Sequence, residues 1–189
     1  SRAVSSVPDV VSEVEAQRRY YAETAADYDS MHIDEGDEHF FALAWLSALI
    51  GHHNYQSLLD IGSGTGRAII DLKAKHSLKC VGIEPVEALR TQGHAKGLSF
   101  DELRDGDVLK LDFPDNSFDV VCAFAVLHHV KDHKAAVREM CRVARRAVFI
   151  SDANNFGQGS AVKRGLKQLI NAVGLWAAYD WLATRGKGY

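Results

Sequence analysis

The segment Asp60-Ile61-Gly62-Ser63-Gly64-Thr65-Gly66 places one carboxylate and three glycines, spaced two apart, directly after an apolar run. Glycines at 62 and 64 let the backbone turn sharply and let a ligand approach the peptide planes closely. A helix beginning near Ala68 would present unpaired backbone N–H groups, and the positive end of its dipole, to this loop. The pattern therefore predicts a binding loop for a nucleotide-like ligand.

The spacing of the glycines narrows the class of nucleotide. The dinucleotide fingerprint G-x-G-x-x-G needs its third glycine at position 67, where this chain has Arg67. A phosphate-binding P-loop would end in Gly-Lys followed by Ser or Thr, and the segment has no such ending. The spacing thus argues against an NAD-dependent oxidoreductase and against a P-loop nucleotidase.

The surrounding sequence predicts an α/β fold. From Ser57 onward, short apolar runs alternate with amphipathic segments, which is typical of β-α-β units and a parallel sheet. The predicted strands are 57–61, 79–83, 99–103, 120–124 and 147–151, and the predicted helices between them are 68–75, 86–96 and 134–143. Such sheets bind ligands at the carboxyl ends of their strands, so the residues at those ends are the candidates for a site.

Two of these strand ends carry acidic residues. Glu84, followed by Pro85, stands 20 residues after Gly64, and a carboxylate there can accept hydrogen bonds from both ribose hydroxyls. After the strand at 99–103, Asp107 and Val108 offer a carboxylate beside a backbone N–H, which would match an adenine amino group and its neighbouring ring nitrogen. The alternative for this second segment is an ordinary Asp-Gly-Asp turn.

The flanking segments are predicted to be helical. Helices are expected at 9–21 and at 38–50, the second ending at Gly51 with Phe41, Ala44, Trp45, Ala48 and Leu49 on one face. The stretch 161–182 is amphipathic with a basic edge, and we expect it to form a lid over the substrate. A dimer contact, or an interfacial helix serving a membrane or lipid-like acceptor, is the alternative.

Composition bounds the class of protein. With 189 residues, 47% hydrophobic and 25% charged, the chain fits one soluble globular domain. We expect a helical cap at 1–56, a binding core at 57–152, and a helical lid or incomplete C-terminal part at 153–189. A net charge of -3 argues against a nucleic-acid binder. Three cysteines without a C-x-x-C pair favour a reducing, cytoplasmic location.

The motifs LLDIGSGTGR, GIEP, GDVLKLDFPDNSFDVV and LHHV, in this order and at these intervals, resemble those of the small-molecule class I S-adenosylmethionine-dependent methyltransferases. The resemblance covers roughly residues 20–152 and implies a Rossmann-like fold and methyl transfer to oxygen, nitrogen or carbon of a small molecule. It implies that S-adenosylmethionine, and the product S-adenosylhomocysteine, are bound by Tyr28, Asp60, Gly62, Ser63, Gly64, Gly66, Glu84, Pro85, Asp107, Val108, Ala123 and Phe124.

Two departures qualify the resemblance. Methyltransferases that act on nucleic-acid amino groups carry an Asn/Asp-Pro-Pro-aromatic tetrad where this chain has Ala123-Phe124-Ala125-Val126, which argues against nucleic-acid substrates. The family's sheet ends with a β-hairpin, and the sequence after Ser151 does not predict these strands 6 and 7. A non-catalytic module of the same fold, binding a nucleoside or a partner, is therefore the alternative function.

The chemistry of methyl transfer needs few groups. It is an in-line displacement, so positioning does most of the work, and a base is required only when the acceptor must lose a proton. His128 and His129, just past the strand at 120–124, are the candidate bases, although such a pair could equally pack against the following segment. Tyr20, Tyr21 and Trp45 are tentative acceptor-pocket residues, and no metal site is expected.

Overall fold

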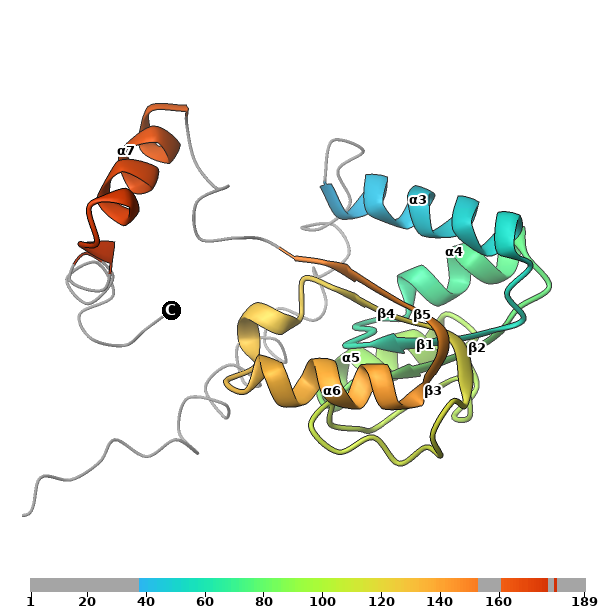
Figure 1. The fold of residues 1–189 in the computed structure, drawn as a ribbon. Coiled ribbons are helices and arrows are strands. Elements are labelled where there is room, and N and C mark those ends of the chain that lie inside the picture. The colour runs from blue at the N-terminus through green and yellow to red at the C-terminus, as the bar shows by residue number, and fades with distance from the viewer. Residues whose placement is uncertain (1–37, 153–160, 177–178, 180–189) are drawn as a thin grey trace, which may run out of the picture. The chain divides into compact units, whose positions relative to one another are not determined.

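The computed structural model describes residues 38–152, 161–176 and 179 (Figure 1). The chain divides into two compact units, residues 1–152 and residues 153–189. The helix predicted at 9–21, and the candidate residues Tyr20, Tyr21 and Tyr28, lie outside the described residues. The second unit contributes one described helix, α7 (Ala161–Ala172).

Five parallel strands form one sheet in the order β3-β2-β1-β4-β5, which confirms the predicted α/β class. They are β1 (Ser57–Ile61), β2 (Lys79–Ile83), β3 (Leu103–Arg104), β4 (Phe118–Phe124) and β5 (Ala144–Ser151). The helices of this unit are α3 (Glu38–His53), α4 (Arg67–Lys75), α5 (Glu87–Ala95), the short 3-10 helix η2 (Leu127–His129) and α6 (His133–Val143). Strand order reverses beside β1, so β1 and β4 flank the switch point where such sheets bind ligands.

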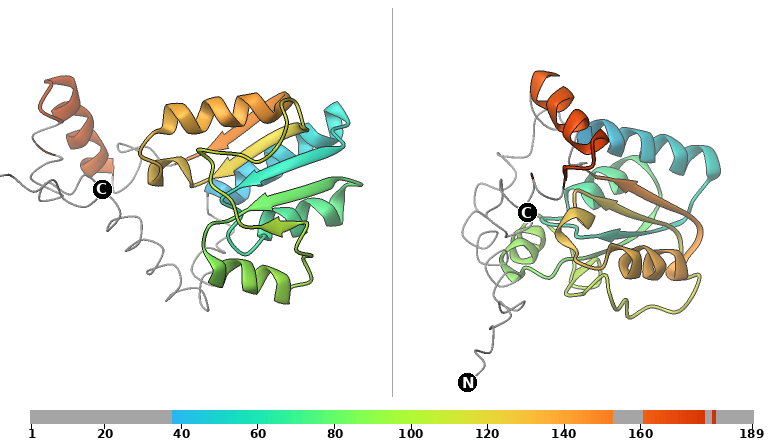
Figure 2. Two further views of the ribbon diagram at one scale, coloured as in Figure 1. Left: turned by 90° about the horizontal axis from the view of Figure 1, so that it is seen from below. Right: turned by 60° about the vertical axis from the view of Figure 1, so that its left-hand side comes forward.

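The sheet is buried on both faces because its central strands are apolar at nearly every position. On one face, Leu58 and Val120 pack against side chains of α3 and α4, among them Leu46 and Ile69. On the other face, strand residues pack against Met140 and its neighbours on α6. Figures 1 and 2 show α3 and α4 on one side of the sheet and α6 on the other. Burial on both faces is why the strands read as continuous apolar runs rather than alternating ones.

Helix α3 is where the sequence prediction was wrong in detail. The predicted inward face is outside: Phe41 is 66% and Trp45 is 58% exposed, whereas Leu43, Leu46 and Ile50 are buried. The helix is apolar on most of its circumference, so the 3.6-residue period does not select a face. Gly51 does not end the helix, which continues to His53.

Strand β3 also differs from its prediction. It comprises only Leu103 and Arg104, because the predicted residues before it form a turn. In that turn the Ser99 N–H and hydroxyl both donate to the Glu102 carboxylate. Strands β4 and β5 are longer than predicted, starting at Phe118 and Ala144.

Candidate functional site

The glycine-rich loop joins β1 to α4 at the carboxyl edge of the sheet. Gly62, Gly64 and Gly66 all have positive φ, at 64°, 55° and 77°. The Ser63 N–H donates to the Ile83 carbonyl at 3.0 Å, which fastens the loop to the end of β2. A Cβ at Gly62 would lie 2.5 Å from Val126 Cγ2, so this loop and the segment after β4 touch. The loop therefore needs glycine both for its turn and for this close approach.

Two further glycines, which sequence reasoning did not single out, let neighbouring elements support the loop. A Cβ on Gly82, in β2, would lie 2.2 Å from the Ser63 hydroxyl oxygen. A Cβ on Gly93, in α5, would lie 2.3 Å from Leu103 Cδ2 and 3.0 Å from the Thr65 carbonyl oxygen. Gly82 and Gly93 stand 16 and 27 residues after Gly66, the last glycine of the motif, so only the fold reveals their part in it.

Glu84 anchors the loop through its carboxylate. Its Oε2 accepts from the Gly64 N–H and its Oε1 from the Val86 N–H, each at 2.9 Å. Burial raises the pKa of Glu84, while these two hydrogen bonds and the Arg90 guanidinium oppose the rise. A carboxylate has about four acceptor positions, so the two oxygens can still accept from ligand hydroxyls. The structure shows that Glu84 holds the loop, a role that the sequence did not predict. Its binding to the ribose stays a prediction.

Asp60 is the second buried carboxyl at this edge, with 2% of its surface exposed. Burial raises its pKa to about 6, although hydrogen bonding with Ser63 and Cys122 opposes the rise. The Cys122 thiol, from the neighbouring position on β4, lies 3.4 Å from Asp60 Oδ1. The Gly64 N–H of the loop is thus held by Glu84, while Asp60 interacts with the Ser63 and Cys122 side chains.

The segment after β3 turns at residues 107–110, whereas the alternative reading had placed a turn at Asp105-Gly106-Asp107. Asp107 Oδ1 accepts from the Leu109 N–H at 2.9 Å, and the Asp107 carbonyl accepts from the Lys110 N–H. Val108 is buried at 7% exposure, whereas Asp107 is exposed. The turn does not remove the adenine hypothesis for these two residues, which stays a prediction.

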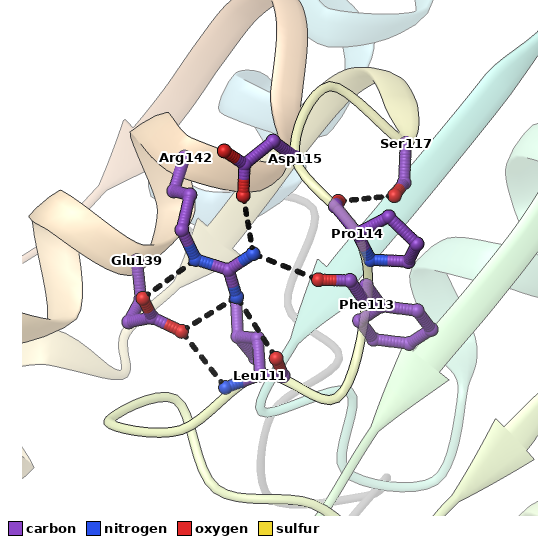
Figure 3. A network of polar contacts seen from close by, with 7 residues as sticks. All are labelled: Leu111, Phe113, Pro114, Asp115, Ser117, Glu139 and Arg142. Atoms are coloured by element: carbon purple, nitrogen blue, oxygen red, sulfur yellow. Dashed lines mark hydrogen bonds and ion pairs between the residues drawn. The ribbon is translucent and has the colours of Figure 1, made fainter.

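Arg142 on α6 fixes the continuation of that turn (Figure 3). Its guanidinium donates to the carbonyls of Leu111 and Phe113, at 2.9 and 2.8 Å, and to the carboxylates of Asp115 and Glu139. The Arg142 hydrogen bonds lower the pKa of Glu139 to about 2, and Glu139 also accepts from the Leu111 N–H. The segment that carries Asp107 and Val108 is therefore tied to a helix of the core.

The candidate residues at the end of β4 lie beside β1. Ala123 is buried and pairs with Ile61, and Phe124 packs near Phe149, with ring centroids 5.8 Å apart. The next residue, Ala125, has a φ of 55°, which is unusual for a non-glycine residue. Such a conformation persists only where its surroundings fix it, and local backbone strain of this kind clusters at functional sites.

The two candidate bases both lie on η2, which begins two residues after Ala125. Asp152, just past β5, accepts from the Leu127 and His128 N–H groups through Oδ2, at 2.7 and 3.2 Å. Its Oδ1 lies 2.5 Å from His128 Nδ1. The His128 and His129 ring centroids are 3.8 Å apart, and desolvation together with His128 lowers the pKa of His129. Sequence reasoning missed Asp152. The one signal for it was that an acidic residue directly follows the predicted strand at 147–151.

Trp45 lies exposed on α3 beside Phe41, with ring centroids 6.4 Å apart, and its substrate role stays a prediction. Within the described ranges there is no cluster of three or more His, Cys, Asp or Glu side chains that could hold a metal ion. No helix among the described residues is long and apolar enough to cross a membrane.

Comparison with known proteins identifies the domain. Residues 59–150 match the family described as "Methyltransferase domain". The norajmaline N-methyltransferase of Rauvolfia serpentina is 35% identical over 94 residues, which cover 47% of this chain and 32% of that enzyme. The demethylmenaquinone methyltransferase of Roseiflexus sp. (strain RS-1) is 34% identical over 155 residues, covering 77% and 61%. The chain thus spans about a third of the plant relative that it matches.

A solved structure shares the fold at lower identity. The crystal structure of the [4+2]-cyclase SpnF superimposes with a TM-score of 0.55 at 21% identity, covering 68% of this chain and 55% of that one. At this identity the similarity shows the fold alone.

The residues present fit S-adenosylmethionine, the methyl donor of this family. That molecule offers ribose hydroxyls, an amino group and a cationic sulfonium, all of which suit acceptors or negative charge. The site supplies two buried carboxyls, Asp60 and Glu84, beside a glycine loop that opens onto the first turn of α4. The match at residues 59–150, together with the sheet order and the glycine loop, supports assignment of this domain to the class I S-adenosylmethionine-dependent methyltransferases.

Proposed function

We propose that this chain transfers the methyl group of S-adenosylmethionine to oxygen, nitrogen or carbon of a small-molecule acceptor. The observation that carries the proposal is the Glu84 carboxylate, which holds the Gly64 N–H at the carboxyl edge of the sheet, next to the switch point. Two relatives are named for small-molecule acceptors, norajmaline and demethylmenaquinone, which supports an acceptor of this class.

Each part of the cofactor has a proposed partner in the chain. Glu84 accepts from the ribose hydroxyls, and Asp107 with the Val108 N–H binds the adenine. Asp60, with the carbonyls of Ala123 and Phe124, faces the amino group. When bound, S-adenosylmethionine supplies a methyl group on a sulfonium centre. The chain contributes chiefly by holding donor and acceptor in attack geometry, which supplies a large part of the rate of such displacements.

The chain's chemical contribution is to remove a proton where the acceptor carries one. His128 Nε2 takes the proton from the acceptor atom, and the electron pair left on that atom forms the new bond to the methyl carbon. The pair of the broken carbon–sulfur bond stays on sulfur, so charge and atoms balance. A basic nitrogen near neutral pH suits this step.

Calorimetric titration with S-adenosylmethionine, S-adenosylhomocysteine and NAD tests the cofactor assignment. We expect binding of the first two and none of NAD. Glu84→Ala should weaken S-adenosylhomocysteine binding by about 1–3 kcal/mol, the scale of hydrogen bonds to a charged group. Glu87→Ala, which removes an exposed carboxylate three residues away, is the matched control and should bind normally.

Two results would contradict the proposal. Unchanged affinity in a folded Glu84→Ala protein, checked by circular dichroism, would refute the ribose assignment. Normal cofactor binding without turnover in a broad acceptor screen would favour the non-catalytic, nucleoside-binding alternative. His128→Ala and His129→Ala should slow turnover without changing cofactor affinity, and normal rates in both would remove the base hypothesis.

A further inference from the structure

Asp152 makes three contacts with one short segment. Its Oδ2 accepts from the N–H groups of Leu127 and His128, the first two residues of η2. Its Oδ1 contacts Nδ1 of the His128 ring. The Asp152 side chain is 16% exposed, while that of His128 is 38% exposed. One largely buried carboxylate therefore fixes both the backbone and the ring of an accessible histidine.

These contacts determine which nitrogen of His128 is basic. An ionised carboxylate only accepts hydrogen bonds, so Nδ1 must carry the hydrogen that points at Oδ1. In the neutral ring the lone pair then resides on Nε2. The second oxygen cannot turn away to release the ring, because it is held by two backbone N–H groups. The ring orientation and tautomer are therefore set together.

The dyad also lies close to the cofactor loop. Val126, two residues before His128, is the side chain that a Cβ on Gly62 would strike. Asp152 itself follows Ser151, whose carbonyl accepts from the strained Ala125 N–H at 2.8 Å. The ends of β4 and β5 thus place the His128–Asp152 pair at the same edge as the glycine loop.

We propose that Asp152 is a positioning residue that fixes His128 as the Nδ1–H tautomer, so that Nε2 faces the acceptor as the proton-accepting atom. This inference rests on the proposed function and narrows its substrate class. A built base is of use for acceptors whose oxygen or nitrogen still carries a proton, such as a hydroxyl or an ammonium group. A thioether, which has no proton to lose, gains nothing from it.

The substitution Asp152→Asn tests the geometry sharply. The amide oxygen must stay with the two backbone N–H groups, since an NH2 there would face two donors. The amide NH2 is then left facing Nδ1, which must accept, and the proton moves to Nε2. The segment therefore keeps its place, but the lone pair of the His128 ring is now on Nδ1, which faces the new amide, and no longer on Nε2. Asp132→Asn is the matched control, because Asp132 caps α6 by accepting from the Ala135 N–H at 2.8 Å.

Nitrogen-15 NMR of the histidine rings reads the tautomer directly, at about pH 9 where an ordinary imidazole is neutral. His128→Gln identifies the signal by removing it. We expect Nδ1–H in the wild type and in Asp132→Asn, and Nε2–H in Asp152→Asn. An Nε2–H ring in the wild type, or an unchanged tautomer in Asp152→Asn, overturns the proposal.

Chemical modification supplies a second readout that needs no acceptor. Diethyl pyrocarbonate attacks an unprotonated ring nitrogen, so His128, located by peptide mass spectrometry, should react at least five-fold more slowly in Asp152→Asn than in Asp132→Asn. Equal rates overturn the proposal. Binding of S-adenosylhomocysteine should stay within about three-fold of wild type in both variants. If the wild type itself does not bind S-adenosylhomocysteine, the proposed function is refuted. The tautomer measurement would still decide the role of Asp152.

Discussion

The buried Asp60 carboxyl should make the stability of this protein depend on pH in an unusual direction. Its pKa in the folded protein is about 6, above the ordinary value of 3.8. An acid whose pKa is raised by folding stabilises the folded state fully below the unfolded pKa, and that contribution is lost as the pH rises through the folded value. The perturbation is Asp60→Asn, which removes this titration and keeps the size of the side chain.

The magnitude follows from the shift. A raise of about two pKa units corresponds to about 3 kcal/mol between very low and neutral pH. About 2 kcal/mol of it falls between pH 4.5 and 7.5, because pH 4.5 already lies above the unfolded pKa. The free energy of unfolding of Asp60→Asn, minus that of the wild type, should therefore rise by about 2 kcal/mol across this window.

Urea unfolding at several pH values, followed by circular dichroism, measures this difference. Any fixed cost of the new amide, such as an unpaired N–H near Cys122, is the same at every pH and drops out of the slope. The other carboxyls with shifted pKa values are present in both proteins and cancel as well. A difference that stays flat between pH 4.5 and 7.5, or that falls, would refute the assignment of a raised pKa to Asp60.

Two further predictions concern the loop and its ligand. Gly93→Ala should lower the free energy of unfolding by about 1–3 kcal/mol, because the new Cβ would lie 2.3 Å from Leu103 Cδ2 and 3.0 Å from the Thr65 carbonyl. Thermal unfolding checks it, with Gly165→Ala in α7 as the control, since nothing lies within 4 Å there and the alanine should stabilise rather than destabilise its helix. S-adenosylhomocysteine should bind more weakly as the pH falls below about 6, because Asp60 takes up a proton. Calorimetry at three pH values should show a larger loss in the wild type than in Asp60→Asn, which retains Glu84 with its raised pKa.

Much of the core could be predicted from sequence because local signals and tertiary burial agree there. The ranges of β1 and β2 match their predictions to the residue, since apolar runs flanked by polar turns leave little freedom. The glycine loop was recognised because its positive φ angles require glycine at fixed spacing. Cys80 and Cys122 lie in two of the predicted strands and pack as small apolar side chains, at 4% and 0% exposure.

The remaining features depend on contacts between distant residues. The buried face of α3 could not be selected, because the helix is apolar on most sides and only the sheet decides between Leu46 and Trp45. The hydrogen bonds from Arg142 to the segment at 111–115 join residues that are 27 to 31 positions apart. No local sequence pattern predicts such contacts. Asp152 is likewise 24 residues from His128.

The two site carboxylates Glu84 and Asp152 share one design. Each follows a strand at the carboxyl edge and accepts from the backbone of a neighbouring segment: Glu84 from the Gly64 N–H, and Asp152 from the Leu127 and His128 N–H groups. Such contacts fix the loop before any ligand arrives, which reduces the ordering cost of binding and catalysis. It follows that alanine at either position removes a loop anchor together with a functional group. A loss of activity in an alanine variant would therefore not assign chemistry to these residues, whereas Asp152→Asn, which keeps the anchor and changes the tautomer of the His128 ring, separates the two effects.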